Sequence, residues 1–135
     1  MPSVVKTETL ELRNEQDIVL ARQAVRRLSQ ACGFSLVDQT KMITAASELA
    51  RNTVTYGQGG SMLCETLLDG IRTGLRLTFV DSGPGIADVS LAMTDGWTSG
   101  SGLGMGLTGA KRLVNEFELD TKPGHGTRVI ITRWK

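Results

Sequence analysis

The chain has 135 residues, of which 40% are hydrophobic and 21% charged, and its formal net charge at pH 7 is +1. This length is enough for one domain with its own core, so we expect residues 1–135 to form a single domain. The balanced charge argues against a nucleic-acid-binding protein, and no apolar run is long enough for a signal peptide or a membrane span. Cys32 and Cys64 stand too far apart for a CxxC motif, so we expect reduced core thiols and a cytoplasmic location.

The first half of the chain contains one expected strand and two expected helices. Residues 4–12 alternate well enough for a strand. Asp17 is expected to cap a helix that Gly33 stops, because its apolar residues recur at helical spacing. A second helix is expected over about residues 36–56.

The second half contains mainly strands. The expected elements are strands at 61–68 and 74–81, a short helix at 88–93, a helix at 104–117, and strands at 118–122 and 127–133. Helices followed by hairpin-connected strands, with one more helix inserted, are typical of an α+β fold rather than of a βαβ parallel sheet. We therefore predict a two-layer α/β sandwich with a mixed, mostly antiparallel sheet.

Glycine is concentrated in one region. The chain has 16 glycines, and eight of them lie between Asp81 and Lys111. Glycine weakens regular structure, so such a cluster indicates backbone that turns sharply or approaches a ligand closely. Function is therefore to be sought in this region and in the elements that pack against it.

The segment ELARN, residues 48–52, places Glu48 and Asn52 four residues apart on one face of the second helix. An amide oxygen can ligate a hard cation, and a carboxylate can orient or deprotonate an attacking hydroxyl, so the pair suits a Mg²⁺–phosphate site. Such pairs are also common on solvated helix faces, and the spacing alone leaves that alternative open.

The segment DSGPGI, residues 81–86, directly follows an expected strand. The carboxylate of Asp81 could accept a hydrogen bond from an adenine amino group, while Gly83 and Gly85 let backbone approach the base. A plain tight turn with an aspartate at the strand end is the alternative, and Pro84 with the glycines would favour it equally.

The segment GSGLGMGLTG, residues 100–109, leads into a helix, so its backbone N–H groups could cradle phosphate oxygens. It contains a formal GxGxxG, but a polar loop rather than a strand precedes it, which disfavours a dinucleotide-binding βαβ unit. In the last segment, GHGT at 124–127, the hydroxyl of Thr127 could support the adenine end. His125 lies between two glycines in a turn and is expected to be exposed rather than catalytic.

In their order and positions, these four segments resemble the N box, the G1 box, the G2 box and the terminal GT of the GHKL ATPase superfamily, which has the Bergerat fold. The stretches ARQAVRRL, DQTKMITAASELARN, DSGPGI, SGLGMGL and AKRLVNEF extend the resemblance over most of the chain. They look like the serine/threonine switch kinases of the RsbT group, relatives of the anti-sigma-factor kinases of the RsbW and SpoIIAB type.

The resemblance implies a role for each matched position. Glu48 would activate the attacking nucleophile, and Asn52 would ligate the Mg²⁺ that bridges the ATP phosphates. The base pocket would be formed by Asp81, Gly83, Gly85, Ile86 and Thr127. The phosphate-facing lid would be formed by Gly102, Leu103, Gly104, Met105, Gly106 and Leu107. The 15 residues between Ile86 and Gly102 imply a compact lid, which the stretch Trp97–Ser101 would close.

The resemblance implies an ATP-dependent protein serine/threonine kinase that acts on a STAS-domain antagonist, in a stressosome-like assembly of a bacterial stress or sigma-factor partner-switching pathway. A PP2C-type phosphatase activator or a sigma factor would be a further partner. The alternative is an anti-sigma factor or sequestering module whose conformation is set by ATP, and the intact Glu48 favours catalysis over it. A catalytic fragment of a histidine kinase is disfavoured because no phospho-acceptor helix is recognisable.

Overall fold

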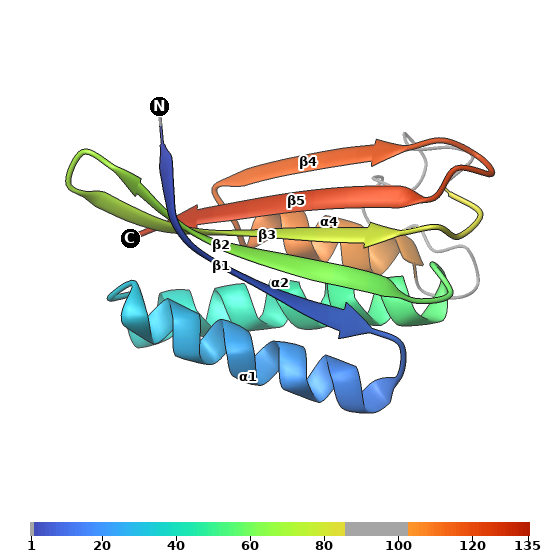
Figure 1. The fold of residues 1–135 in the computed structure, drawn as a ribbon, viewed down its shortest axis with the longest axis horizontal. Coiled ribbons are helices and arrows are strands. Elements are labelled where there is room, and N and C mark those ends of the chain that lie inside the picture. The colour runs from blue at the N-terminus through green and yellow to red at the C-terminus, as the bar shows by residue number, and fades with distance from the viewer. Residues whose placement is uncertain (1, 86–102) are drawn as a thin grey trace.

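The computed structural model describes residues 2–85 and 103–135, which form a five-stranded sheet with three helices on one face (Figure 1). Its elements are β1 (Ser3–Leu12), α1 (Glu15–Ala31), α2 (Leu36–Thr55), β2 (Gly60–Asp69), β3 (Arg72–Asp81), α4 (Leu103–Arg112), β4 (Glu116–Thr121) and β5 (Thr127–Trp134). This arrangement confirms the predicted α+β two-layer sandwich. The predicted helix at 88–93 and the stretch 97–101 lie outside the described residues.

The sheet has the order β1-β2-β3-β5-β4, and all four pairings between its described strands are antiparallel. The register places Asp81, the last residue of β3, opposite Gly60 on β2 and opposite Thr127 on β5. The sheet therefore brings the DSGPGI and GHGT segments together at one end, although 37 residues separate them in sequence.

The start of α1 differs from the prediction. Asn14, not Asp17, is the N-cap: its backbone is extended, and its side-chain oxygen accepts a hydrogen bond from the Asp17 N–H at 3.1 Å. Asp17 lies inside the first turn, where its carboxylate accepts from the Arg13 N–H at 2.8 Å. The helix thus begins at Glu15, because asparagine can satisfy a free amide of the first turn. The predicted stop at Gly33 is confirmed by a φ of 79° there.

Helix α2 packs against both α1 and α4 within the helical layer and supplies much of the core. Ser35 caps it by accepting from the Asp38 N–H at 3.1 Å. Its buried residues pack towards the inner side chains of the sheet. Cys32 and Cys64 are both buried and free, as predicted, and burial raises the pKa of the Cys64 thiol to about 12. None of the described helices has the length and apolar character that a membrane crossing requires.

Helix α4 is shorter than the predicted helix over 104–117, which was wrong at its end. It stops at Arg112, and β4 begins at Glu116. Between them the Asn115 N–H donates to the Thr132 carbonyl at 3.0 Å, and the Asn115 side chain accepts from the Trp134 N–H at 2.7 Å. Pairing with β5 therefore draws Phe117 into a strand, although its spacing continues the helical pattern.

Candidate functional site

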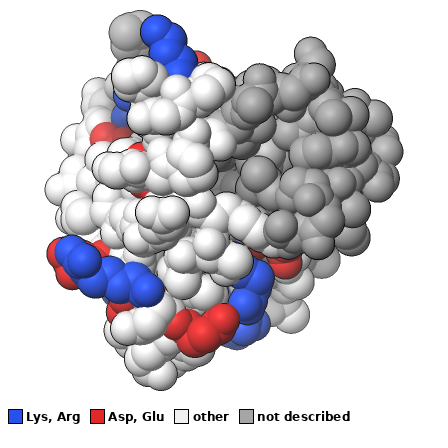
Figure 2. All heavy atoms as spheres, turned by 90° about the vertical axis from the view of Figure 1, so that its right-hand side faces the viewer, with Lys and Arg blue, Asp and Glu red and all other residues white. Residues whose placement is uncertain are grey.

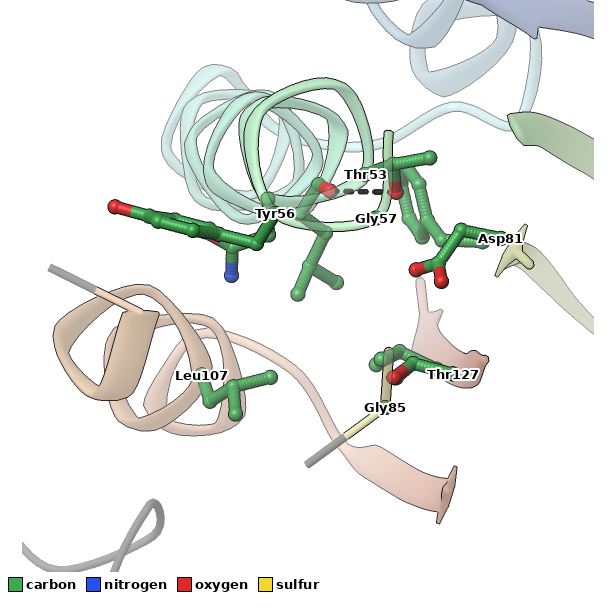
Figure 3. Close-up of a pocket in the computed structure, with 11 residues that line it drawn as sticks. Thr53, Tyr56, Gly57, Asp81, Gly85, Leu107 and Thr127 are labelled. Carbon is green, nitrogen blue, oxygen red and sulfur yellow. Dashed lines mark hydrogen bonds between the residues drawn. The ribbon is translucent and has the colours of Figure 1, made fainter. Parts of the chain in front are cut away.

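A pocket lies between α2, α4 and the end of the sheet where β3 ends and β5 begins (Figure 3). It contains about 430 Å³ of empty space when its open mouth is included. Five of the residues singled out in the sequence line it together: Asn52, Asp81, Gly85, Leu107 and Thr127. The remaining wall consists of Leu49, Thr53, Tyr56, Gly57, Phe79 and Val129.

Asp81 presents its carboxylate to this pocket from the end of β3 (Figure 3). Its Oδ1 accepts a hydrogen bond from the Gly83 N–H at 2.9 Å. Burial raises the pKa of Asp81, and hydrogen bonds from the Gly83 and Thr127 backbone oppose that shift. The result is a partly buried carboxylate that is held by backbone N–H groups, and a carboxylate has further lone pairs that can accept from a ligand.

Gly57, just past the end of α2, makes room for this carboxylate. A Cβ added to Gly57 would collide with the Asp81 side chain, including Oδ2. The Gly83 backbone also lies against Gly57, since a Cβ on Gly83 would sit 2.8 Å from the Gly57 Cα. In the sequence Gly57 looks only like a helix stop, so this function was missed. The run of three glycines among residues 57–60 is the signal that could have revealed it.

Asn52 reaches the same pocket from α2, near its C-terminal end. Its side chain lies against Gly106 of α4, where an added Cβ would sit 2.8 Å from Asn52 Nδ2. That nitrogen is buried and has no hydrogen-bond partner among the described residues. Buried polar atoms are nearly always paired in native proteins, so an unpaired one at a pocket wall indicates a ligand group that completes the site.

Glu48 lies one turn of α2 before Asn52, as predicted, but it is exposed and is not part of the pocket wall. A carboxylate in this position is accessible to a second macromolecule. The structure therefore separates the two residues by environment: Asn52 faces the enclosed pocket, and Glu48 faces solvent beside it.

Thr127 closes the opposite side of the pocket. Its hydroxyl lies 3.0 Å from that of Thr121, and the Thr121 hydroxyl donates to the Gly126 carbonyl at 2.9 Å. Since Thr121 uses its only hydroxyl proton on that carbonyl, Thr127 donates to Thr121 and keeps lone pairs that can accept from a ligand or a water. His125 is exposed in the preceding turn, as predicted.

For the other residues predicted for the site, the structure gives either the backbone element alone or no description. Ile86 and Gly102 lie outside the described residues. Leu103, Gly104 and Met105 form the start of α4, and their phosphate-binding role stays a prediction. The apolar wall residues were not predicted, because Leu49, Phe79 and Val129 cannot be told from ordinary core positions in the sequence.

Most of the described surface on the side of the molecule where the pocket opens is neither acidic nor basic (Figure 2). In Figure 2, which views the molecule end-on from this side, charged side chains gather toward the margins of the described surface. Among the residues that the structure describes, no group of three or more His, Cys, Asp and Glu side chains could hold a metal ion.

Comparisons with known proteins identify the family of the chain. The family model described as "Histidine kinase-, DNA gyrase B-, and HSP90-like ATPase" matches residues 37–135, and the chain belongs to this family of ATP-binding domains. It is 42% identical over 125 residues to the serine/threonine-protein kinase RsbT of Bacillus subtilis. The matched region covers 93% of this chain and 94% of that protein. Within the family, the chain is thus a serine/threonine kinase of the RsbT type, as the sequence motifs predict.

Two further comparisons extend this placement. The chain is 28% identical over 131 residues to the anti-sigma F factor of Clostridium novyi, covering 90% of this chain and 89% of that protein. A crystal structure of the RsbU and RsbW domains of a Mycobacterium tuberculosis protein superposes with a TM-score of 0.65 at 20% identity. That match covers the whole of this chain and 33% of the other, and it supports the fold.

Proposed function

We propose that this kinase transfers the γ-phosphate of Mg·ATP to a serine or threonine of a STAS-domain antagonist in a bacterial partner-switching pathway. The observation that carries the proposal is the pocket itself. It has a carboxylate acceptor, Asp81, on the sheet side, and an unpaired buried amide, Asn52, where α2 meets α4. The likeness to RsbT over nearly the full length of both chains supports the choice of substrate class.

The residues present fit Mg·ATP. Asp81 would accept from the adenine amino group, with Thr127 and a bridging water beside it. The amide of Asn52 has a buried nitrogen that can donate to a phosphate oxygen and an oxygen that can ligate Mg²⁺. The start of α4 would add backbone N–H groups. Bound Mg²⁺ would neutralise charge on the phosphate oxygens, which is the main requirement of phosphoryl transfer.

Glu48 would act on the incoming hydroxyl. Its exposed carboxylate, one turn from Asn52, can be reached by a serine or threonine side chain of a docked protein. It would hold that hydroxyl in line with the phosphate and accept its proton. Two buried free thiols support a reducing cytoplasm as the place of this reaction.

A second function is favoured by one observation: a relative at 28% identity is an anti-sigma F factor. In that case the chain would sequester a sigma factor or another regulator, and nucleotide would set its conformation. The two functions differ in what they require of Glu48. Catalysis depends on its carboxylate, whereas sequestration does not require it.

The deciding experiment incubates the purified chain with Mg·ATP and a STAS-domain protein encoded beside it, followed by mass spectrometry of the partner. We expect a phosphoserine or phosphothreonine with the wild type and with Thr44→Ala, an exposed change one turn earlier on α2. Glu48→Gln should bind ATP normally and transfer about 100-fold more slowly, within the range for a lost general base. Stable binding of a sigma factor without any transfer would favour the second function.

A further inference from the structure

Arg133, on β5, connects three elements that are distant in sequence. Its Nη2 donates to Asp38 Oδ1 at 2.7 Å, and its Nη1 donates to the Leu113 carbonyl at 2.9 Å. Asp38 lies in the first turn of α2, and Leu113 is the first residue after α4. One guanidinium group therefore joins the start of α2, the end of α4 and the last strand.

This contact is largely removed from solvent. The side chains of Arg133 and Asp38 are 14% and 27% exposed, whereas those of the surface pair Arg13 and Glu11 are 71% and 70% exposed. Arg133 Nε is buried and has no partner among the described residues. A cation at the C-terminal end of one helix and an anion at the N-terminal start of another also match both helix dipoles. Loss of the guanidinium would leave Asp38 with a poorly solvated charge.

The other end of α4 takes part in the nucleotide site. Gly106 packs against the Asn52 amide, and Leu107 lines the pocket. Helix α4 has three glycines in ten residues, Gly104, Gly106 and Gly109, so its own helix propensity is low and its position depends on tertiary contacts. Arg133 provides such a contact at the end where Leu113 leaves the helix.

We propose that Arg133 is a positioning residue for phosphate binding: by fixing the C-terminal end of α4 to α2 and β5, it sets where Gly106 meets Asn52. The inference rests on the proposed function in one respect, the placement of the ATP phosphates at Asn52 and the start of α4. Its consequence is specific. Loss of Arg133 weakens binding of the phosphates and leaves binding of the adenosine part unchanged.

The test compares Arg133→Met with Arg76→Met. Arg76 is a matched control, because its ion pair with Glu65 has a similar length, 2.9 Å, and similar burial, at 32% and 14% exposed. In the register of β3 and β5, Arg76 lies opposite Thr132. Because successive residues of a strand point to opposite faces, Arg76 and Arg133 lie on different faces of the sheet. For each protein, NMR titrations give the dissociation constants for Mg·ATP and for adenosine, and hydrogen exchange gives the protection of the α4 amides.

We expect Arg133→Met to weaken Mg·ATP binding about tenfold, as misplaced binding groups do, and to change adenosine binding less than about twofold. Protection of the α4 amides should fall in the absence of nucleotide, and Arg76→Met should show neither effect. Arg133→Lys keeps the charge but lacks the two separate nitrogens that bond Asp38 and Leu113, so its effect should be intermediate.

Three outcomes overturn the positioning role: equal weakening of both ligands, unchanged Mg·ATP binding, or the same result in Arg76→Met. If Arg133→Met does not fold, Asp38→Asn, which keeps an acceptor for the guanidinium, takes its place, with a smaller loss of the same kind expected. A wild-type chain that does not bind Mg·ATP would instead refute the proposed function, so the two failures are distinguishable.

Discussion

The substitution Asp81→Asn tests the adenine end of the site through the geometry of one side chain. In the wild type, Oδ1 accepts from the Gly83 N–H at 2.9 Å, and the carboxylate has further lone pairs for the base. Asparagine has a single acceptor oxygen. If that oxygen keeps the bond to Gly83, the NH₂ group faces the pocket and meets the adenine amino group donor to donor.

The expected loss follows from that exchange. A hydrogen bond to a charged group contributes about 1.5–3 kcal/mol, so affinity for Mg·ATP should fall roughly 10- to 150-fold. The nucleotide-free protein should unfold at the same temperature or higher, because burial disfavours the charged form of Asp81 and raises its pKa. Loss of binding without loss of stability would separate a ligand contact from a structural one.

Isothermal titration with Mg·ATP measures the affinity, and thermal unfolding measures the stability. Asp69→Asn is the control, since it makes the same chemical change in the hairpin at the other end of β2. Affinity within about twofold of the wild type in Asp81→Asn would refute the assignment of Asp81 to the adenine amino group, as that is less than one neutral hydrogen bond contributes.

Three other outcomes are expected. Gly106→Ala would place a Cβ 2.8 Å from Asn52 Nδ2, so it should weaken Mg·ATP binding about tenfold in titrations. A Cβ at Gly109 would meet no described atom within 4 Å outside its own helix. Gly109→Ala should therefore leave binding intact and stabilise the protein by up to about 1 kcal/mol in thermal unfolding. Because the pKa of Asp81 is raised, lowering the pH through it should weaken ATP binding in the wild type more than in Asp81→Asn, while the free energy of unfolding without nucleotide rises. Cys64, buried with a pKa of about 12, should react with a thiol reagent only on unfolding.

Much of this architecture is predictable from local pattern. A few neighbouring residues are enough to predict the helix ends at Gly33 and Gly57. The same holds for the alternation in β3 and for the glycine-rich start of α4. The end of α4 does not, because Leu113, Val114 and Phe117 continue its helical spacing. Only the pairing of Asn115 with the distant Thr132 and Trp134 decides that the chain turns there.

The site shows the same division. Asn52, Asp81 and Thr127 are visible in the sequence because their residue types and order match a chemical task. Gly57 is not visible in this way, because its role is to leave room for the Asp81 side chain, which the sheet register places beside it. Arg133 is likewise indistinguishable from any charged residue near a strand end until α2 and α4 are seen to meet it.

The central claim is that one pocket holds Mg·ATP with its base at Asp81 and its phosphates at Asn52. A crystal structure of the chain with Mg²⁺ and a non-hydrolysable ATP analogue tests it most directly. We predict the adenine amino nitrogen within hydrogen-bond distance of the Asp81 carboxylate, and Mg²⁺ ligated by Asn52 and the phosphates. Nucleotide bound in the reverse orientation, or at another place on the molecule, would contradict the account.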